Sequence, residues 1–269
     1  MKTLFRIRHA TYEDLPAIIK ISVDSWRTSY KGIIDQTYLD NISYERRLEH
    51  SQKNFHSNPI TRLVAELYDV GIVAFADGGP AREAAYKDHG EIYAIYSQEK
   101  FKGQGIGRVL FQAIRRKLFE QGFQKQYLWV LENNPTTKFY KKAGGLPEIK
   151  RDRKIGDQIL SEVIMKWREF KYDSIFHLTT KSAWGEAATK GEYTHQSFSR
   201  EGFIHFSEEH QLGRIAESFY KDVKDLVTLE VDLNNSNLNF KFELSPTEEF
   251  PHLYQTLPTH LVKNVRIFS

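Results

Sequence analysis

The stretch that decides the fold runs from Glu91 to Leu110 and reads EIYAIYSQEKFKGQGIGRVL. Up to Tyr96 it is a β-rich apolar run of strand length, which polar residues then end. Three glycines follow at every second position, from Gly103 to Gly107, where they allow a tight turn and a close approach to a ligand. From Arg108 the apolar residues have helical spacing. We therefore predict a strand, a glycine turn and a helix, whose first N–H groups form a phosphate site.

The kind of phosphate ligand is narrowed by exclusion. A nucleoside triphosphate loop ends in Gly-Lys-Ser/Thr, but Arg108 and Val109 follow Gly107 here. A dinucleotide fingerprint requires a third glycine where this sequence has Leu110. What remains, KGQGIG at residues 102–107, resembles the acyl-CoA pyrophosphate loop of the GNAT N-acetyltransferase superfamily, with lysine in place of the usual arginine or glutamine. A glycine turn without a ligand is the alternative interpretation.

Two further segments strengthen this resemblance. Glu91 lies six positions before Ser97, where the central strand of the superfamily commonly carries a general-base carboxylate. The segment from Asn134 to Gly144, NPTTKFYKKAG, is similar to the family pattern N-x-x-x-x-F-Y-x-x-x-G, in which the tyrosine, here Tyr140, lies near the thioester sulfur. The three matches occur in the expected order, and the resemblance implies acetyl-CoA as the cosubstrate.

The fold class that we expect is α/β (α+β). The resemblance implies a GNAT-type mixed, mostly antiparallel sheet flanked by helices, followed by a second, smaller α+β domain. We expect an acetyltransferase domain at residues 1–169 and a small domain of unknown function at residues 170–269. In acetyltransferases of this type the central strand and the next one splay apart, leaving a V-shaped slot for the pantetheine arm.

Spacing along the chain predicts several other elements of the first domain. They are a strand at 5–10, a helix from about 11 to 26, one helical stretch at 33–48, strands at 62–67 and 71–76, a loop at 78–89, and strands at 126–131 and 159–167.

The resemblance also implies roles for individual residues. Glu91 is expected to be the general base and Tyr140 the general acid that protonates the leaving thiolate. The alternatives are a carboxylate held in a salt bridge for Glu91 and a ring packed on the sheet for Tyr140. The residues expected to bind the cofactor are Ile95, Tyr96, Ser97, Lys102, Gly103, Gln104, Gly105, Ile106, Gly107, Arg108 and Asn134, of which Asn134 equally fits a helix cap.

The acceptor pocket is expected near the first helix. By the same resemblance, Trp26, Tyr30 and Tyr38 are candidates for substrate contact, although aromatic residues at helical spacing also suit a core. The expected substrate is a small-molecule or protein amine. The acceptor itself and the oligomeric state, including a homodimer, stay open.

Composition and charge exclude several classes of protein. Zero cysteine excludes disulfides, thiolate metal sites and a cysteinyl acyl intermediate. Residues 1–169 carry 28 Lys and Arg against 21 Asp and Glu, whereas residues 170–269 carry 10 against 14. The basic half fits a polyphosphate cofactor, and its scattered charges and lack of a motif argue against nucleic acid. We expect no membrane segment, no signal peptide and a cytoplasmic location.

The second half resembles a small uncharacterised bacterial domain. The matching patterns are I-x-H-x-T at 175–179, G-F-I-H-x-S at 202–207 and F-P-H-x-Y at 250–254. A fold thought to be related to ADP-ribosyltransferases would imply an NAD-like pocket around His177, Tyr193, His205 and Ser207. Histidines with a purely structural role are the alternative, and we expect no metal, because His205 and His210 have the wrong spacing for one helical face.

The predicted function is therefore transfer of an acetyl group from acetyl-CoA to a primary amine. Two alternatives stay open: a GNAT fold that senses acyl-CoA without transferring it, and an NAD-dependent ADP-ribosyltransferase-like activity in the C-terminal domain.

Overall fold

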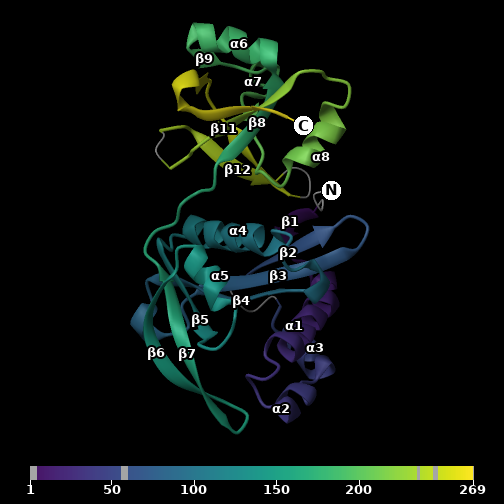
Figure 1. Cartoon of the computed structure of the whole chain (residues 1–269), viewed down its shortest axis with the longest axis vertical. Helices are drawn as coiled ribbons and strands as arrows, with labels where there is room; N and C mark the ends of the chain where they lie inside the picture. Colours follow the sequence, from purple (N-terminus) through teal and green to yellow (C-terminus); the bar gives the residue numbers. More distant parts are fainter. Residues whose placement is uncertain (1–4, 56–59, 235–236, 245–247, 269) are drawn as a thin grey trace. The chain divides into compact units, whose positions relative to one another are not determined.

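The computed structural model describes residues 5–55, 60–234, 237–244 and 248–268. The chain divides into two compact units, His9–Phe170 and Lys171–Ser269 together with Met1–Arg8. Each unit has its own clusters of buried apolar side chains. Figure 1 shows the helices and strands of the chain.

A seven-stranded sheet with the order β1-β2-β3-β4-β5-β7-β6 forms the centre of the N-terminal half of the chain. From β2 to β6 every pair of neighbours is antiparallel except β4 with β5, which is parallel. This confirms the mixed, mostly antiparallel sheet. The strands are β1 (Phe5–His9), β2 (Thr61–Leu67), β3 (Gly71–Pro80), β4 (His89–Ser97), β5 (Lys125–Leu131), β6 (Leu146–Ile155) and β7 (Gln158–Trp167).

Helices cover both faces of this sheet, with α1 on one side and α4 on the other (Figure 1). On the α1 side, Ile18 and Ile21 pack with Val64 and Phe75. On the other side, a Cβ added to Gly78 would lie 3.2 Å from Ile114, so glycine allows α4 to approach the strand closely. The helices are α1 (Leu15–Ser29), α2 (Gln36–Asp40), α3 (Tyr44–Lys53), α4 (Ile106–Glu120) and α5 (Thr137–Lys142), with short 3-10 turns at Tyr12–Asp14, Ala84–Tyr86 and Glu99–Phe101.

Three expected elements differ in extent. The helical stretch at 33–48 is two helices, because Asp35 caps α2 through the N–H of Tyr38 (3.0 Å) and Ser43 caps α3 through the N–H of Arg46 (3.1 Å). The loop at 78–89 is shorter than expected, because β3 continues to Pro80. Helix α4 begins at Ile106, two residues before the predicted start.

Strands β4 and β5 separate after a short parallel contact. His89 to Glu91 pair with Lys125 to Tyr127, but β4 runs on to Ser97 without pairing further with β5, and both strands are fully described. On its other edge β4 stays paired with β3, apart from a bulge at Tyr93 between the partners of Asp77 and Gly78. The predicted V-shaped slot is therefore confirmed.

The described part of the C-terminal unit contains three small sheets, with the orders β15-β11-β8, β10-β13-β12 and β14-β9. Its apolar core includes Tyr193, Phe206 and Leu229, all at most 1% exposed. The elements are β8 (Ile175–Thr180), α6 (Lys181–Lys190), β9 (Glu192–Tyr193), α7 (Gln196–Glu201), β10 (Ile204–His205), α8 (Leu212–Phe219), β11 (Leu226–Val231), β12 (Phe240–Leu244), β13 (Glu249–Leu253), β14 (Leu257–Pro258), a 3-10 turn (Thr259–Leu261) and β15 (Val262–Ile267).

Within the described residues, no helix is long and apolar enough to cross a membrane.

Candidate active site

A cavity of about 120 Å³ opens where β4 and β5 separate. Residues 92–97 of β4 form one side of it and residues 128–130 of β5 the other. Helix α1 and the segments after β4 and β5 complete the lining with Ser25, Ser29, Tyr30, Lys102, Asn134, Thr136 and Tyr140.

The edge of β4 that faces this cavity has no partner strand. Since every second N–H and C=O of a strand points to the same edge, the backbone from Ile92 onward has hydrogen-bonding groups to offer to a bound molecule. The predicted cofactor residues Ile95, Tyr96 and Ser97 lie on this part of β4 and line the cavity. The Ser25 hydroxyl donates to the carbonyl oxygen of Ser97 (3.2 Å) and so ties α1 to the end of the strand.

The glycine turn leads directly into α4. Gly103 and Gly105 have φ angles of 78° and 84°, in the left-handed region that favours glycine, and Gly105 is the N-cap of the helix. The N–H groups of Arg108 and Val109 both donate to the Gly105 carbonyl (3.0 and 3.2 Å), whereas no described group accepts from the N–H of Ile106 or Gly107. The start of this 15-residue helix thus presents two free N–H groups and its positive dipole end.

Three longer side chains of the predicted set lie in or beside this turn. The ammonium group of Lys102 pairs with Glu99 (2.6 Å), donates to the Ser29 hydroxyl (3.1 Å) and lines the cavity. Gln104 and Arg108 are exposed, and the Gln104 amide donates to the carbonyl oxygen of Lys100 (3.2 Å).

Tyr140 packs as its alternative interpretation expects and also lies at the cavity, and its role as the general acid stays a prediction. Its ring packs with Phe111, Phe139 and Trp167, at centroid distances of 5.8, 5.3 and 6.3 Å, and it also lines the cavity. No described group hydrogen-bonds its hydroxyl. Burial, assisted by the nearby Tyr30, raises the pKa of Tyr140 far above its ordinary value. The phenol therefore stays protonated at any physiological pH.

Glu91 is not among the residues that line the cavity. Its carboxylate is 2% exposed, is paired with the Arg82 guanidinium, and accepts hydrogen bonds from the Arg82 N–H and the Tyr127 hydroxyl (both 2.9 Å). These contacts match the alternative interpretation, a carboxylate in a salt bridge. Its role as a general base stays a prediction.

Asn134 lies at the cavity and caps the turn that leads into α5. Its side-chain oxygen accepts from the N–H and the hydroxyl of Thr136 (2.9 and 2.8 Å), as expected for a cap. A contact with the cofactor stays a prediction.

The three aromatic candidates for acceptor contact are not equivalent. Tyr30 lines the cavity, and Trp26 lies behind it with the two rings 5.0 Å apart. Tyr38 lies against the turn at Gly156, where an added Cβ would be 2.9 Å from its ring. Of the three, only Tyr30 lines the cavity.

Several lining residues were missing from the predicted set. Ser25 and Ser29 are four residues apart on α1, so helical spacing could have placed both on one face of this helix. Arg82, the partner of Glu91, lies in a connection whose course no pattern predicted.

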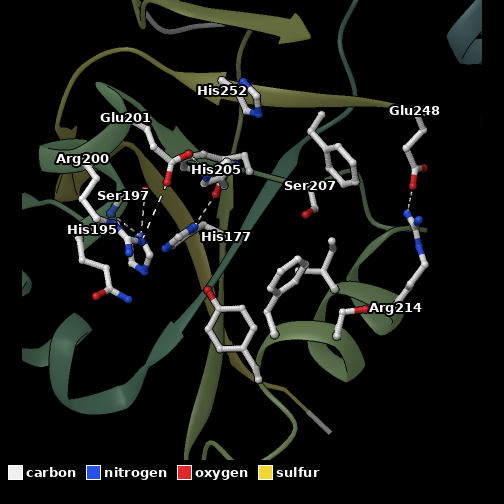
Figure 2. A pocket seen from close by; sticks show the side chains of 17 residues that line it. His177, His195, Ser197, Arg200, Glu201, His205, Ser207, Arg214, Glu248 and His252 are labelled. Atoms are coloured by element: carbon white, nitrogen blue, oxygen red, sulfur yellow. Dashed lines mark hydrogen bonds and ion pairs between the residues drawn. The ribbon is translucent and has the colours of Figure 1, made fainter. Parts of the chain in front are cut away.

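The C-terminal unit has a larger cavity, of about 510 Å³ (Figure 2). Of the four residues predicted there, His177, His205 and Ser207 line it. Tyr193 is buried behind them, and its hydroxyl lies 2.8 Å from Nε2 of His177. Among the described residues, no three His, Cys, Asp or Glu side chains are placed to hold a metal ion.

Comparison with known proteins identifies the two halves separately. Residues 19–145 match the model of the acetyltransferase (GNAT) family, and residues 178–265 match a family described as a protein of unknown function, DUF952. In the solved structures, a proposed acetyltransferase from Acinetobacter baylyi shares the fold, with a TM-score of 0.50 and 18% identity over 62% of this chain and 94% of that chain.

Two curated relatives match over nearly their whole length. Spermidine N(1)-acetyltransferase of Thermoplasma acidophilum is 27% identical over 172 residues, 62% of this chain and 98% of that protein. The uncharacterized N-acetyltransferase YuaI of Bacillus subtilis is 34% identical over 161 residues, 60% of this chain and 91% of that protein. The chain therefore belongs to the GNAT family and is an acetyl-CoA-dependent acetyltransferase.

Proposed function

We propose that this protein transfers the acetyl group of acetyl-CoA to a primary amine by direct attack of the amine nitrogen on the thioester. The observation that carries the proposal is the separation of β4 from β5 after Glu91 and Tyr127, which leaves a cavity beside an unpaired strand edge. The pantetheine arm has amide groups, so it can bind along that edge as an added strand does.

The diphosphate of the cofactor is assigned to the turn at residues 103–108. The N–H groups of Ile106 and Gly107 have no described acceptor, and the positive end of the α4 dipole adds to them. Gly103 and Gly105 bring no side chain that would keep a phosphate away from the backbone. Lys102 and Arg108 supply positive charge beside the turn.

The reaction needs an oxyanion donor and an acid. The deprotonated amine forms a C–N bond to the thioester carbon, and a backbone N–H of β4 near 95–97 stabilises the oxyanion. When the C–S bond breaks, the Tyr140 hydroxyl, which lines the cavity and stays protonated, donates its proton to the leaving sulfur, and the proton that the nitrogen then loses returns to the Tyr140 oxygen. The chain has no cysteine, which agrees with a direct transfer rather than a cysteinyl intermediate.

The contacts of Glu91 support a positioning role. A carboxylate that holds Arg82 and Tyr127 fixes the start of β4 at the point where the strands separate. Its predicted role as the base requires contact with the amine. Comparison of Glu91→Gln with Glu162→Gln separates the two roles.

The proposed acceptor is an amine. One relative is named for spermidine, which supports a small-molecule amine, and a protein amine is the second candidate. Tyr30, on the wall of the cavity, is the residue proposed to contact the acceptor, with Trp26 supporting its ring.

Release of free thiol from acetyl-CoA in the presence of different amines tests the proposal. Tyr140→Phe should lower kcat by about a hundredfold, in the range for general acid catalysis, without changing the affinity for coenzyme A in calorimetry. Tyr93→Phe is the matched control, because Tyr93 also lines the cavity but its hydroxyl donates to the Pro80 carbonyl (2.5 Å).

Two outcomes would contradict the proposal. Equal losses of kcat in both variants would remove Tyr140 as the acid, and no heat with acetyl-CoA would remove the assignment of the turn. The acyl-CoA sensor and the NAD-dependent activity of the C-terminal unit stay predictions that no observation here favours.

A further inference from the structure

The cavity of the C-terminal unit is lined by residues of two helices and three strands. Figure 2 shows His195, Ser197, Arg200 and Glu201 on one side, from α7 and its N-cap, and Arg214 of α8 on the opposite side. The histidines of β8, β10 and β13 line it as well. With about 510 Å³, the cavity has the volume of a site for a small organic molecule.

Both carboxylates that line this cavity already have partners within the unit. Glu201 accepts from Nε2 of His205 (2.9 Å) and has the Arg200 guanidinium at 4.0 Å. Glu248, 2% exposed, is paired with Arg214 and accepts from the Gln211 amide (3.0 Å). The cavity therefore has little free negative charge to attract a cation.

Hydrogen-bond donors, by contrast, are available at the α7 side. Nδ1 of His195 accepts from the N–H of Ser197 (3.2 Å), so the proton of the neutral ring lies on Nε2, for which no described group is an acceptor. The Arg200 side chain is 65% exposed, and its only described carboxylate contact is the one at 4.0 Å. The Gln196 amide is exposed as well and has no described partner.

The α8 side of the cavity has apolar surface beside the Arg214–Glu248 pair. Ile215 and Phe219 of α8 line it together with Phe250 of β13. Phe219 is 74% exposed, so its ring offers apolar surface to a bound molecule. Donors on one side and apolar surface on the other match a ligand with one charged end and one flat apolar end.

We propose that this cavity binds a small organic anion that has a flat ring. Arg200, Nε2–H of His195 and the Gln196 amide hold its carboxylate or phosphate group, and its ring lies against Ile215 and Phe219. Burial lowers the pKa of His195 and of His177, so Arg200 is the group that supplies the positive charge at neutral pH. This proposal does not depend on the proposed acetyl transfer. The family that matches residues 178–265 is one of unknown function and assigns no ligand to this cavity.

Fluorine NMR titrations of the full chain test the proposal. The probes are 4-fluorophenyl phosphate, 4-fluorobenzoate and the neutral 4-fluorobenzyl alcohol. We expect at least one anion to bind about tenfold or more tightly than the alcohol, because hydrogen bonds between charged groups are the strong ones. Comparison of the phosphate with the benzoate then identifies the preferred acidic group.

Variants on exposed side chains assign the binding to this cavity. Arg200→Gln and Phe219→Ser should each weaken anion binding, Arg200→Gln by about tenfold, and neither side chain is buried. Arg266→Gln is the matched control, since Arg266 is 63% exposed, is paired with Glu230 (2.9 Å) and does not line the cavity.

The proposal is overturned if no probe binds, if the alcohol binds as tightly as the anions, or if Arg266→Gln weakens binding as much as Arg200→Gln. A phosphate bound instead at the turn of residues 103–108 would be recognised by its insensitivity to Arg200→Gln.

Discussion

At the scale of single residues, Glu91 illustrates how a partner changes the role of a side chain. From the sequence it is a strand carboxylate six positions before Ser97, which fits a base. In the structure it meets Arg82 and Tyr127 and does not reach the cavity. No spacing rule predicts Arg82 as its partner, because the two residues are joined by an irregular connection that only the folded chain brings back to β4.

We expect Glu91→Gln to destabilise the protein rather than to stop catalysis. The change leaves the Arg82 charge without its partner, at a cost of about 1–3 kcal/mol, while kcat should stay within about threefold of the parent value. Glu162→Gln is the control, because Glu162 is likewise buried in this sheet, with 3% of its side chain exposed, and is paired with Arg151 and Arg153.

Urea unfolding and thiol release on both variants provide the two measurements. A loss of kcat of a hundredfold or more in Glu91→Gln alone, with stability equal to that of Glu162→Gln, would instead establish Glu91 as the base.

His177 makes the stability of the C-terminal unit depend on pH. Its Nδ1–H donates to the His205 carbonyl (2.6 Å), and burial lowers its pKa to about 3. Below about pH 6.5 His177 binds a proton in the unfolded chain but not in the folded one. The contribution of neutral His177 to the free energy of unfolding is therefore complete above pH 6.5 and falls as the pH drops toward 3. His177 alone can change the free energy of unfolding by up to about 1.4 kcal/mol per pH unit.

Urea titrations of the full chain at several pH values would measure this slope. His177→Gln should make the free energy of unfolding less dependent on pH, whereas the exposed His260→Gln should not. The attribution to His177 would be wrong if both variants kept the slope of the parent.

At the scale of elements, the parts with a strong local pattern were predictable and those made by tertiary contacts were not. The glycine turn predicted the start of α4 to within two residues. Strand β13 was missed because Pro251 lies inside it, although its neighbours β10 and β12 pair on both sides. The extent of strand β6 was not predicted, because it is a mostly exposed, charged edge strand whose apolar pattern is weak.

The turn before α4 yields a prediction that separates ligand contact from stability. Gly107 has no atom within 4 Å of an added Cβ, so Gly107→Ala should not lower stability, because alanine favours helix. We expect it nevertheless to weaken coenzyme A binding by about tenfold, because the methyl group occupies space that the diphosphate needs. Gly185→Ala in α6, an equally open helical glycine, is the control.

Calorimetric titration of both variants with coenzyme A measures the effect. Unchanged affinity in Gly107→Ala would show that the diphosphate does not lie against this turn.

At the scale of the whole molecule, the sequence located each site only in part. The acetyltransferase motifs lie within residues 91–145, where glycine spacing indicated the turn and the resemblance to the family pattern indicated Tyr140. The cavity of the C-terminal unit draws on α7, α8 and three strands, so of its lining only His177, His205 and Ser207 were predicted. A site whose walls are far apart in sequence leaves no local pattern, because its geometry arises only when the elements pack.

The chain divides into two compact units at about residue 170. Each unit buries its own apolar clusters, so we expect two unfolding transitions in calorimetry of the full chain, in agreement with the proposed domains 1–169 and 170–269. Coenzyme A at about 100 times its dissociation constant stabilises the state that binds it by about 2.7 kcal/mol, which corresponds to a shift in Tm of roughly 5–10 °C. Only the transition of the acetyltransferase unit should shift. If the chain instead unfolded in one transition that moved as a whole with coenzyme A, the two halves would form one cooperative unit, because ligand binding to one part would then stabilise both.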